Sequence, residues 1–90
     1  MMRICARVYG SVQGVGYRAS VHRRISRLAV TGYVRNMPDG SVELDITGEK
    51  EAVDAALLEA HEGSPFSSVE RMETEEIQGD SGYAEFVIER

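Results

Sequence analysis

Residues 3–18 read RICARVYGSVQGVGYR, and a change of period inside this stretch decides the fold. From residue 3 to residue 10 the side chains alternate, with Ile4, Ala6 and Val8 on one side, as in a half-buried β-strand. Three glycines then break the alternation between residues 10 and 16. The stretch therefore predicts a strand followed by a glycine-rich loop.

A helix is predicted to follow this loop. From about Tyr17 onward, Val21, Ile25 and Leu28 recur at the spacing of an amphipathic helix, which we expect to end near residues 29–31. The residues off this apolar stripe are expected to be solvated, with the arginines pairing with acids from later elements. These residues are His22, Arg23, Arg24 and Arg27.

The remaining elements follow from the same periodicities and from turn residues. The pattern predicts strands at 32–36 and 41–47, a helix at 49–61, and strands at 69–77 and 83–88. Between the first two of these strands, Met37-Pro38-Asp39-Gly40 is typical of a tight turn. The order β-α-β-β-α-β plus a short fifth strand predicts an α+β fold of the ferredoxin-like, split βαβ type, with two helices on one face of an antiparallel sheet.

Length and composition exclude several classes of protein. A chain of 90 residues has room for one domain, which we expect to span residues 1–90. No apolar run approaches the roughly 20 residues of a membrane helix, and no secretory signal is apparent. The single cysteine, Cys5, excludes an internal disulfide and a cysteine-based zinc site, and we expect a monomer in the cytoplasm.

Charge is distributed unevenly along the chain, which has a net charge of −5. Residues 1–38 contain seven arginines and no acid, whereas residues 39–90 contain all fifteen acids and three basic residues. Such a cluster of cations could attract a small anion, or the two halves could pair and cancel. A long nucleic acid is not expected as a partner, because it favours a broad basic face.

The loop at residues 10–18 has the chemistry of a phosphate site. Glycines allow successive backbone N–H groups to point into one hollow, and the following helix adds free N–H groups and its positive dipole end. Arg18 stands at the loop–helix junction, where its guanidinium could hold two phosphoryl oxygens. The pattern is neither a Walker loop nor a dinucleotide fingerprint, so by itself it also fits a plain tight turn.

Two stretches together resemble the signatures of the acylphosphatase family. The first is VYGSVQGVGYR at residues 8–18, and the second is GYVRNMPDGSV at residues 32–42, continuing to Gly48. Their order and separation match the family, and the similarity covers nearly the whole chain. Acylphosphatases are small ferredoxin-like domains of about this length that hydrolyse mixed anhydrides of a carboxylic acid and phosphate.

The resemblance implies specific roles for residues of both stretches. Arg18 would bind the phosphoryl group, Asn36 would orient the attacking water, and the loop backbone would form the phosphate cradle. The residues of that cradle would be Gln13, Gly14, Val15, Gly16, Tyr17 and Arg18. Substrate and product would be an acyl phosphate and inorganic phosphate, with no metal and no cofactor, because neither motif contains a carboxylate cluster.

Two alternatives stay open at this point. The loop could serve a non-catalytic ferredoxin-like module that senses an anion or docks a partner, or the chain could be part of a larger carbamoyl-phosphate-handling maturation protein. The end of the chain directly after a strand favours a stand-alone protein. Outside the motifs, we expect Glu73, Glu75 and Glu76 to protect a sheet edge, and Cys5 to serve in packing.

Overall fold

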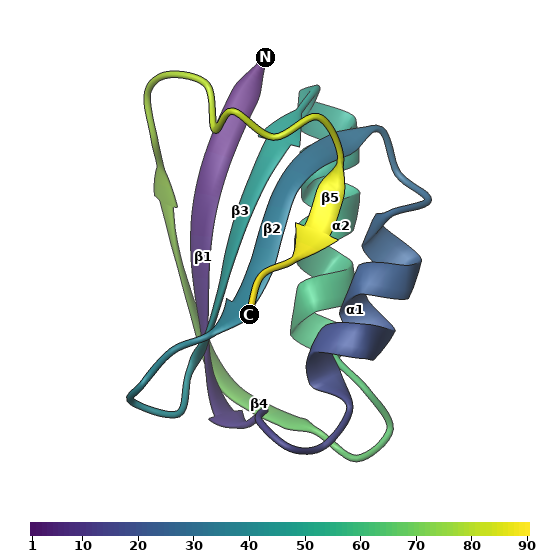
Figure 1. The fold of residues 1–90 in the computed structure, drawn as a ribbon, viewed down its shortest axis with the longest axis vertical. Coiled ribbons are helices and arrows are strands. Elements are labelled where there is room, and N and C mark those ends of the chain that lie inside the picture. The colour runs from purple at the N-terminus through teal and green to yellow at the C-terminus, as the bar shows by residue number, and fades with distance from the viewer.

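The computed structural model describes all residues from Met1 to Arg90 and consists of one sheet with two helices on one of its faces (Figure 1). Its elements, in chain order, are β1 (Met2–Ser11), α1 (Tyr17–Ile25), β2 (Val30–Asn36), β3 (Val42–Gly48), α2 (Lys50–Glu62), β4 (Ser68–Glu76) and β5 (Phe86–Ile88). The predicted order of helices and strands is thus confirmed. Neither helix is long and apolar enough to cross a membrane.

The strands lie in the order β4-β1-β3-β2-β5. β3 pairs antiparallel with β1 and β2, and β4 pairs antiparallel with β1. β5 pairs parallel with β2, so the sheet is mixed and not wholly antiparallel as predicted. Because β1, β2 and β5 all run in the same direction, their C-terminal ends meet at one edge of the sheet. Register shows this directly, since Val42 of β3 is opposite both Val8 of β1 and Asn36 of β2.

The core lies between the sheet and the two helices. Val8, Leu44 and Ile46 on the sheet and Val21 and Val53 on the helices are fully buried, as the alternating and helical patterns predict. Full burial of such a side chain stabilises the fold by about 1.5–3 kcal/mol. This packed layer fixes the position of the start of α1 relative to the C-terminal ends of β1 and β2.

The open face of the sheet carries charges rather than apolar residues. The predicted pairing between the arginine-rich first part and the acidic second part occurs for four of the seven arginines. The ion pairs are Arg3–Asp45, Arg7–Asp39, Arg7–Glu43, Arg24–Glu59 and Arg35–Glu43, of which all but Arg24–Glu59 lie on this side. At the edge of the sheet, β4 exposes Glu73, Glu75 and Glu76, as expected for a protected edge strand.

Three predicted boundaries are wrong by two residues or more. β2 begins at Val30 rather than at residue 32. α1 ends at Ile25 rather than near residues 29–31, because the N–H groups of Arg27 and Leu28 bond to carbonyls three residues back and tighten the chain. Leu28 still packs against the core, which explains why the apolar stripe continues past the helix. The last strand begins at Phe86 rather than Tyr83, whose ring instead packs on that of Tyr33, with 5.4 Å between ring centroids.

Candidate active site

The loop between β1 and α1 is shaped by two glycines in the left-handed region. Gly14 has φ 74° and Gly16 has φ 75°, a conformation that is unfavourable for residues with a Cβ. Gly16 is also the N-cap of α1 and provides no side-chain cap. The first helical bond there runs from the N–H of Ser20 to the carbonyl of Gly16, at 3.1 Å, so the N–H groups of residues 17–19 have no helical partner. Free donors and the positive dipole end therefore meet at this loop.

A hollow of about 180 Å³ lies where this loop meets the end of β2. Its lining consists of Val12, Gly14, Gly16, Tyr17, Arg18, Ala19 and Asn36. Residues from the two stretches that carry the family resemblance thus share one cavity. The sheet explains their meeting, because the parallel strands β1 and β2 both end at this edge.

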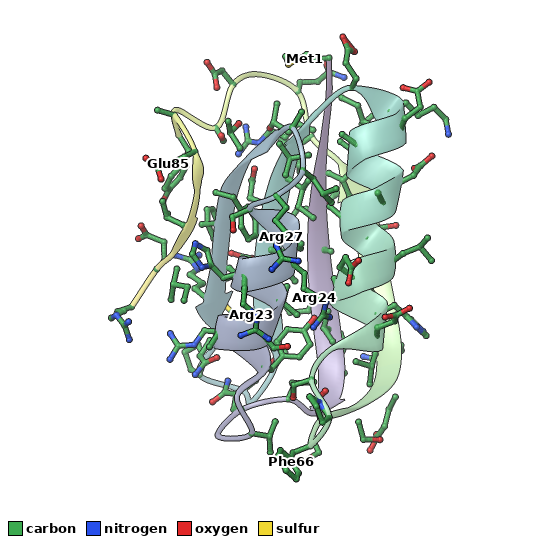
Figure 2. All side chains as sticks on the ribbon, turned by 90° about the vertical axis from the view of Figure 1, so that its right-hand side faces the viewer. Met1, Arg23, Arg24, Arg27, Phe66 and Glu85 are labelled. Atoms are coloured by element: carbon green, nitrogen blue, oxygen red, sulfur yellow. The ribbon has the colours of Figure 1, made fainter.

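Arg18 keeps its positive charge available at the hollow. Its side chain is half-buried, and Nη1 donates to the carbonyl of Glu89 at 3.2 Å. No carboxylate pairs with it, in contrast to the four arginines of the ion pairs above. Figure 2 shows Arg23 and Arg27 on the outer side of α1, whereas Arg24 bonds to Glu59 of α2. Arg18 is the arginine of α1 that lines the cavity.

Asn36 reaches the hollow as the last residue of β2, and its side chain is exposed. The turn that follows it is held by Gln13 of the glycine loop. The side-chain amide of Gln13 donates to the carbonyls of Met37 and Ser41, both at 2.8 Å. The loop and the turn that follows β2 are therefore directly bonded to each other.

Two other predicted cradle residues, Val15 and Tyr17, bond the loop to neighbouring segments. The carbonyl of Val15 accepts a hydrogen bond of 2.9 Å from the hydroxyl of Ser64, in the segment between α2 and β4. Tyr17 is buried, and its hydroxyl donates to the carbonyl of Ala60 in α2. Burial raises the pKa of Tyr17 above its ordinary value. The tyrosine hydroxyl is thus a neutral structural donor and not an acid or base of the site.

The structure brings five of the predicted site residues together around the cavity: Gly14, Gly16, Tyr17, Arg18 and Asn36. Gln13 and Val15 do not line it, and their bonds to neighbouring segments support the loop instead. Sequence reasoning missed Val12 and Ala19, which also line the hollow. As small apolar residues they give no chemical signal, and only their position beside the glycines could have indicated them.

A larger cavity of about 390 Å³ lies at the opposite end of the open face, near the N-terminus. Its lining includes Arg3, but both Nε and Nη2 of this arginine bond to the carboxylate of Asp45. Glu76 and Asp80 add further negative charge there. An anion is therefore better received by the smaller hollow, where Arg18 has no acidic partner.

Comparison with known proteins gives the family. A model of the acylphosphatase family matches residues 4–88. The chain belongs to the acylphosphatase family.

Curated acylphosphatases resemble this chain over nearly its whole length. It is 46% identical to an acylphosphatase of Thermococcus kodakarensis over 84 residues, which cover 91% of this chain and 92% of that protein. It is 43% identical to an acylphosphatase of Methylococcus capsulatus over 90 residues, covering 100% of this chain and 98% of that protein. The crystal structure of acylphosphatase from Bacillus subtilis superposes with a TM-score of 0.94, at 32% identity and with full coverage of both chains.

These similarities decide against one alternative left open by the sequence, the non-catalytic module. The acylphosphatase is an enzyme that hydrolyses acyl phosphates and not a non-catalytic anion-binding module. Its fold is the ferredoxin-like fold expected from the order of its elements.

Proposed function

We propose that acyl phosphate hydrolysis takes place in the hollow between the glycine loop and the end of β2. In this proposal the N–H groups of the loop and the guanidinium of Arg18 hold the phosphoryl oxygens, and Asn36 orients the attacking water. The observation that carries it is the lining of one cavity by Gly14, Gly16, Arg18 and Asn36 at the start of α1. These are donors for an anion on one side and a neutral amide on the other.

The chemistry of the substrate makes such a sparse site sufficient. An acyl phosphate releases a carboxylate, which is a good leaving group and needs no strong general acid. What remains is to neutralise charge on the phosphoryl oxygens and to place water in line with the bond that breaks. The lining offers both functions and contains no histidine, cysteine or carboxylate.

The proton of the attacking water then goes to the substrate. The water oxygen forms a bond to phosphorus, the bond between phosphorus and the acyl oxygen breaks, and the carboxylate leaves with that electron pair. A neutral amide such as Asn36 can accept a hydrogen bond from the water, but it is not a useful base. A phosphate oxygen therefore takes the proton, and inorganic phosphate is released.

The further properties of the enzyme follow the same proposal. A metal-independent reaction is supported by the donor set of the lining, which contains no carboxylate, thiol or imidazole. Every group that lines the hollow comes from one chain, whose sheet runs from Met2 to Ile88, and this supports action as a monomer and as one domain.

The single free cysteine supports a cytoplasmic location. The net charge of −5 supports the absence of a nucleic-acid partner.

Hydrolysis of benzoyl phosphate by the wild type and by Arg18→Ala tests the proposal. We expect Arg18→Ala to lose about 10³-fold in kcat/KM and to lose competitive inhibition by inorganic phosphate. Arg71→Ala is the matched control, since Arg71 lies on β4 and its guanidinium stacks on the ring of Tyr9 away from the hollow. Near-normal turnover and inhibition in Arg18→Ala would refute the assignment.

A further inference from the structure

Helix α1 holds the C-terminal strand through two side chains that are one helical turn apart. Arg18 donates from Nη1 to the carbonyl of Glu89 at 3.2 Å, and Nε2 of His22 lies 3.0 Å from the carbonyl of Phe86. Residues at i and i+4 lie on the same side of a helix, so both side chains face the same C-terminal segment, residues 86–89. The phosphate-binding arginine and His22 therefore share one backbone segment as their partner.

His22 is bound to this strand by packing as well as by a hydrogen bond. Its ring stacks on that of Phe86, with 6.1 Å between the centroids and 19° between the planes. A carbonyl oxygen only accepts, so Nε2 carries the hydrogen of the 3.0 Å bond. The side chain is half-buried, which contradicts the expectation that it would be a solvated group on the polar side of the helix.

β5 needs such support because it is short and lies at the edge of the sheet. It has three residues and pairs with β2 alone. Beyond the strand itself, the segment is fixed by backbone bonds from Gly32 to Glu85, at 3.1 Å, and from Glu89 to Val34, at 2.9 Å. Figure 1 shows β5 beside β2, with the C-terminus following directly. The carbonyl that meets Arg18 thus belongs to the last residues of the chain, one residue past the strand.

We propose that His22 is a positioning residue for Arg18, acting through β5. By fixing the carbonyl of Phe86 and the ring beside it, His22 sets the place of the Glu89 carbonyl, which in turn restricts the guanidinium of Arg18. A free arginine side chain carries about 2 kcal/mol of rotamer entropy, so this restriction favours the orientation that grips phosphate. The inference rests on the proposed role of Arg18 and assigns a further residue to it.

Two substitutions at His22 separate the hydrogen bond from the packing. His22→Phe keeps an aromatic ring against Phe86 and removes the donor, whereas His22→Gln keeps an N–H at a similar reach. We expect His22→Phe to raise both KM for benzoyl phosphate and the inhibition constant of inorganic phosphate about 3- to 10-fold, the range of one lost hydrogen bond. In His22→Gln, both KM and the inhibition constant should stay within about 2-fold of the wild-type values.

The measurements are made well below the melting temperature of each variant, so that a loss of stability alone does not alter KM. His61 provides the control, because it lies near the end of α2 and is exposed. His61→Phe and His61→Gln should leave both constants unchanged. If His22→Phe does not fold, His22→Met replaces it, since methionine lacks the donor and is a good helix former.

Each outcome bears on the proposal. Weakened phosphate binding in His22→Phe, together with recovery in His22→Gln, supports it. A His22→Phe protein with a lower melting temperature but unchanged constants overturns it, as does a His22→Gln protein that is as impaired as His22→Phe. Arg18→Ala, assayed in parallel, keeps the two proposals apart, because normal phosphate inhibition in that variant would refute the role of Arg18 itself.

Discussion

Gln13 and Met37 are joined by a 2.8 Å hydrogen bond from the glutamine amide to the methionine carbonyl. A second bond of the same length runs from the same amide to the carbonyl of Ser41. These bonds connect the glycine loop to the turn that begins beside Asn36. In the proposed site, this side chain therefore helps to set the distance between the loop, which would hold phosphate, and Asn36, which would orient water.

Removal of this link should reduce turnover more than phosphate binding. We expect Gln13→Ala to destabilise the protein by about 1–3 kcal/mol and to lower kcat about 10-fold, because small displacements of reacting groups are costly. Thermal unfolding and benzoyl phosphate kinetics measure both effects. Gln78→Ala, an exposed glutamine near the far cavity, should change neither. A Gln13→Ala protein with lower stability and wild-type kcat would contradict the coupling.

Asn36→Ala should abolish turnover while phosphate binding survives. Loss of an oriented hydrogen-bonding group typically lowers kcat about 10²–10³-fold, whereas the proposed donors for phosphate lie on the loop and on Arg18. Asn36→Asp preserves the shape but adds negative charge, so it should also raise the inhibition constant of phosphate. Near-normal kcat in Asn36→Ala would rule out the water-orienting role.

Gly16→Ala tests the backbone conformation of the loop. A Cβ at Gly16 would meet no atom within 4 Å, so the cost comes from φ of 75° alone and is about 1–2 kcal/mol. Gly79 is a matched control, because it has φ 90° and similarly open space but lies near the far cavity. Both alanine variants should melt earlier, but only Gly16→Ala should raise KM. Equal KM values in the two variants would speak against a role of the loop backbone in binding.

Glu43 should make stability depend on pH on the acid side. Burial raises the pKa of this carboxyl, but hydrogen bonds from Tyr33 and Arg7 and the charge of Arg35 outweigh burial and bring the pKa below its ordinary value of 4.5. The folded state thus favours the ionised form. Its contribution to stability is complete above the ordinary value and is lost as the pH falls through the lowered pKa.

Glu43→Gln should therefore lower the melting temperature at pH 7, and the difference from the wild type should shrink toward pH 3. Melting curves across this range measure the effect. Glu62→Gln serves as the control, since Glu62 is exposed at the end of α2 and forms no ion pair. A difference between wild type and Glu43→Gln that stays constant from pH 7 to pH 3 would exclude this account.

Chelation should leave the enzyme active. The proposed reaction uses hydrogen-bond donors and the charge of Arg18, so dialysis against EDTA should not change kcat or KM. Activity that is lost on chelation and restored by magnesium would contradict a metal-independent reaction.

The family resemblance predicted that Arg18 and Asn36 share a site, and the direction of the strands explains why they meet. A β-α-β-β pattern makes the first two strands parallel to each other, and their C-terminal ends then share an edge. The strand–loop–helix change at residues 3–18 and the turn after Asn36 are local signals that the structure preserves. Tertiary packing changes only where these elements begin and end, as at the end of α1.

The partners of individual polar side chains could not be predicted in the same way. Alternation places Glu43 and Asp45 on the outward side of β3, yet they are 8% and 2% exposed, because Arg3, Arg7, Arg35 and Tyr33 from neighbouring strands cover them. The partner of His22 could not be predicted either, because Phe86 lies 64 residues later in the chain. Long-range contacts of this kind leave no periodic trace in the sequence.

The two outermost strands limit what a second copy of the sheet can attach to. β4 carries several exposed glutamates, and β5 has only three residues. Pairing of two molecules through β4 would bring their negative charges together. Pairing through β5 would form few backbone hydrogen bonds, because this strand is short. The strand order that brings the ends of β1 and β2 to the hollow should thus also disfavour edge-to-edge association of molecules in concentrated solution.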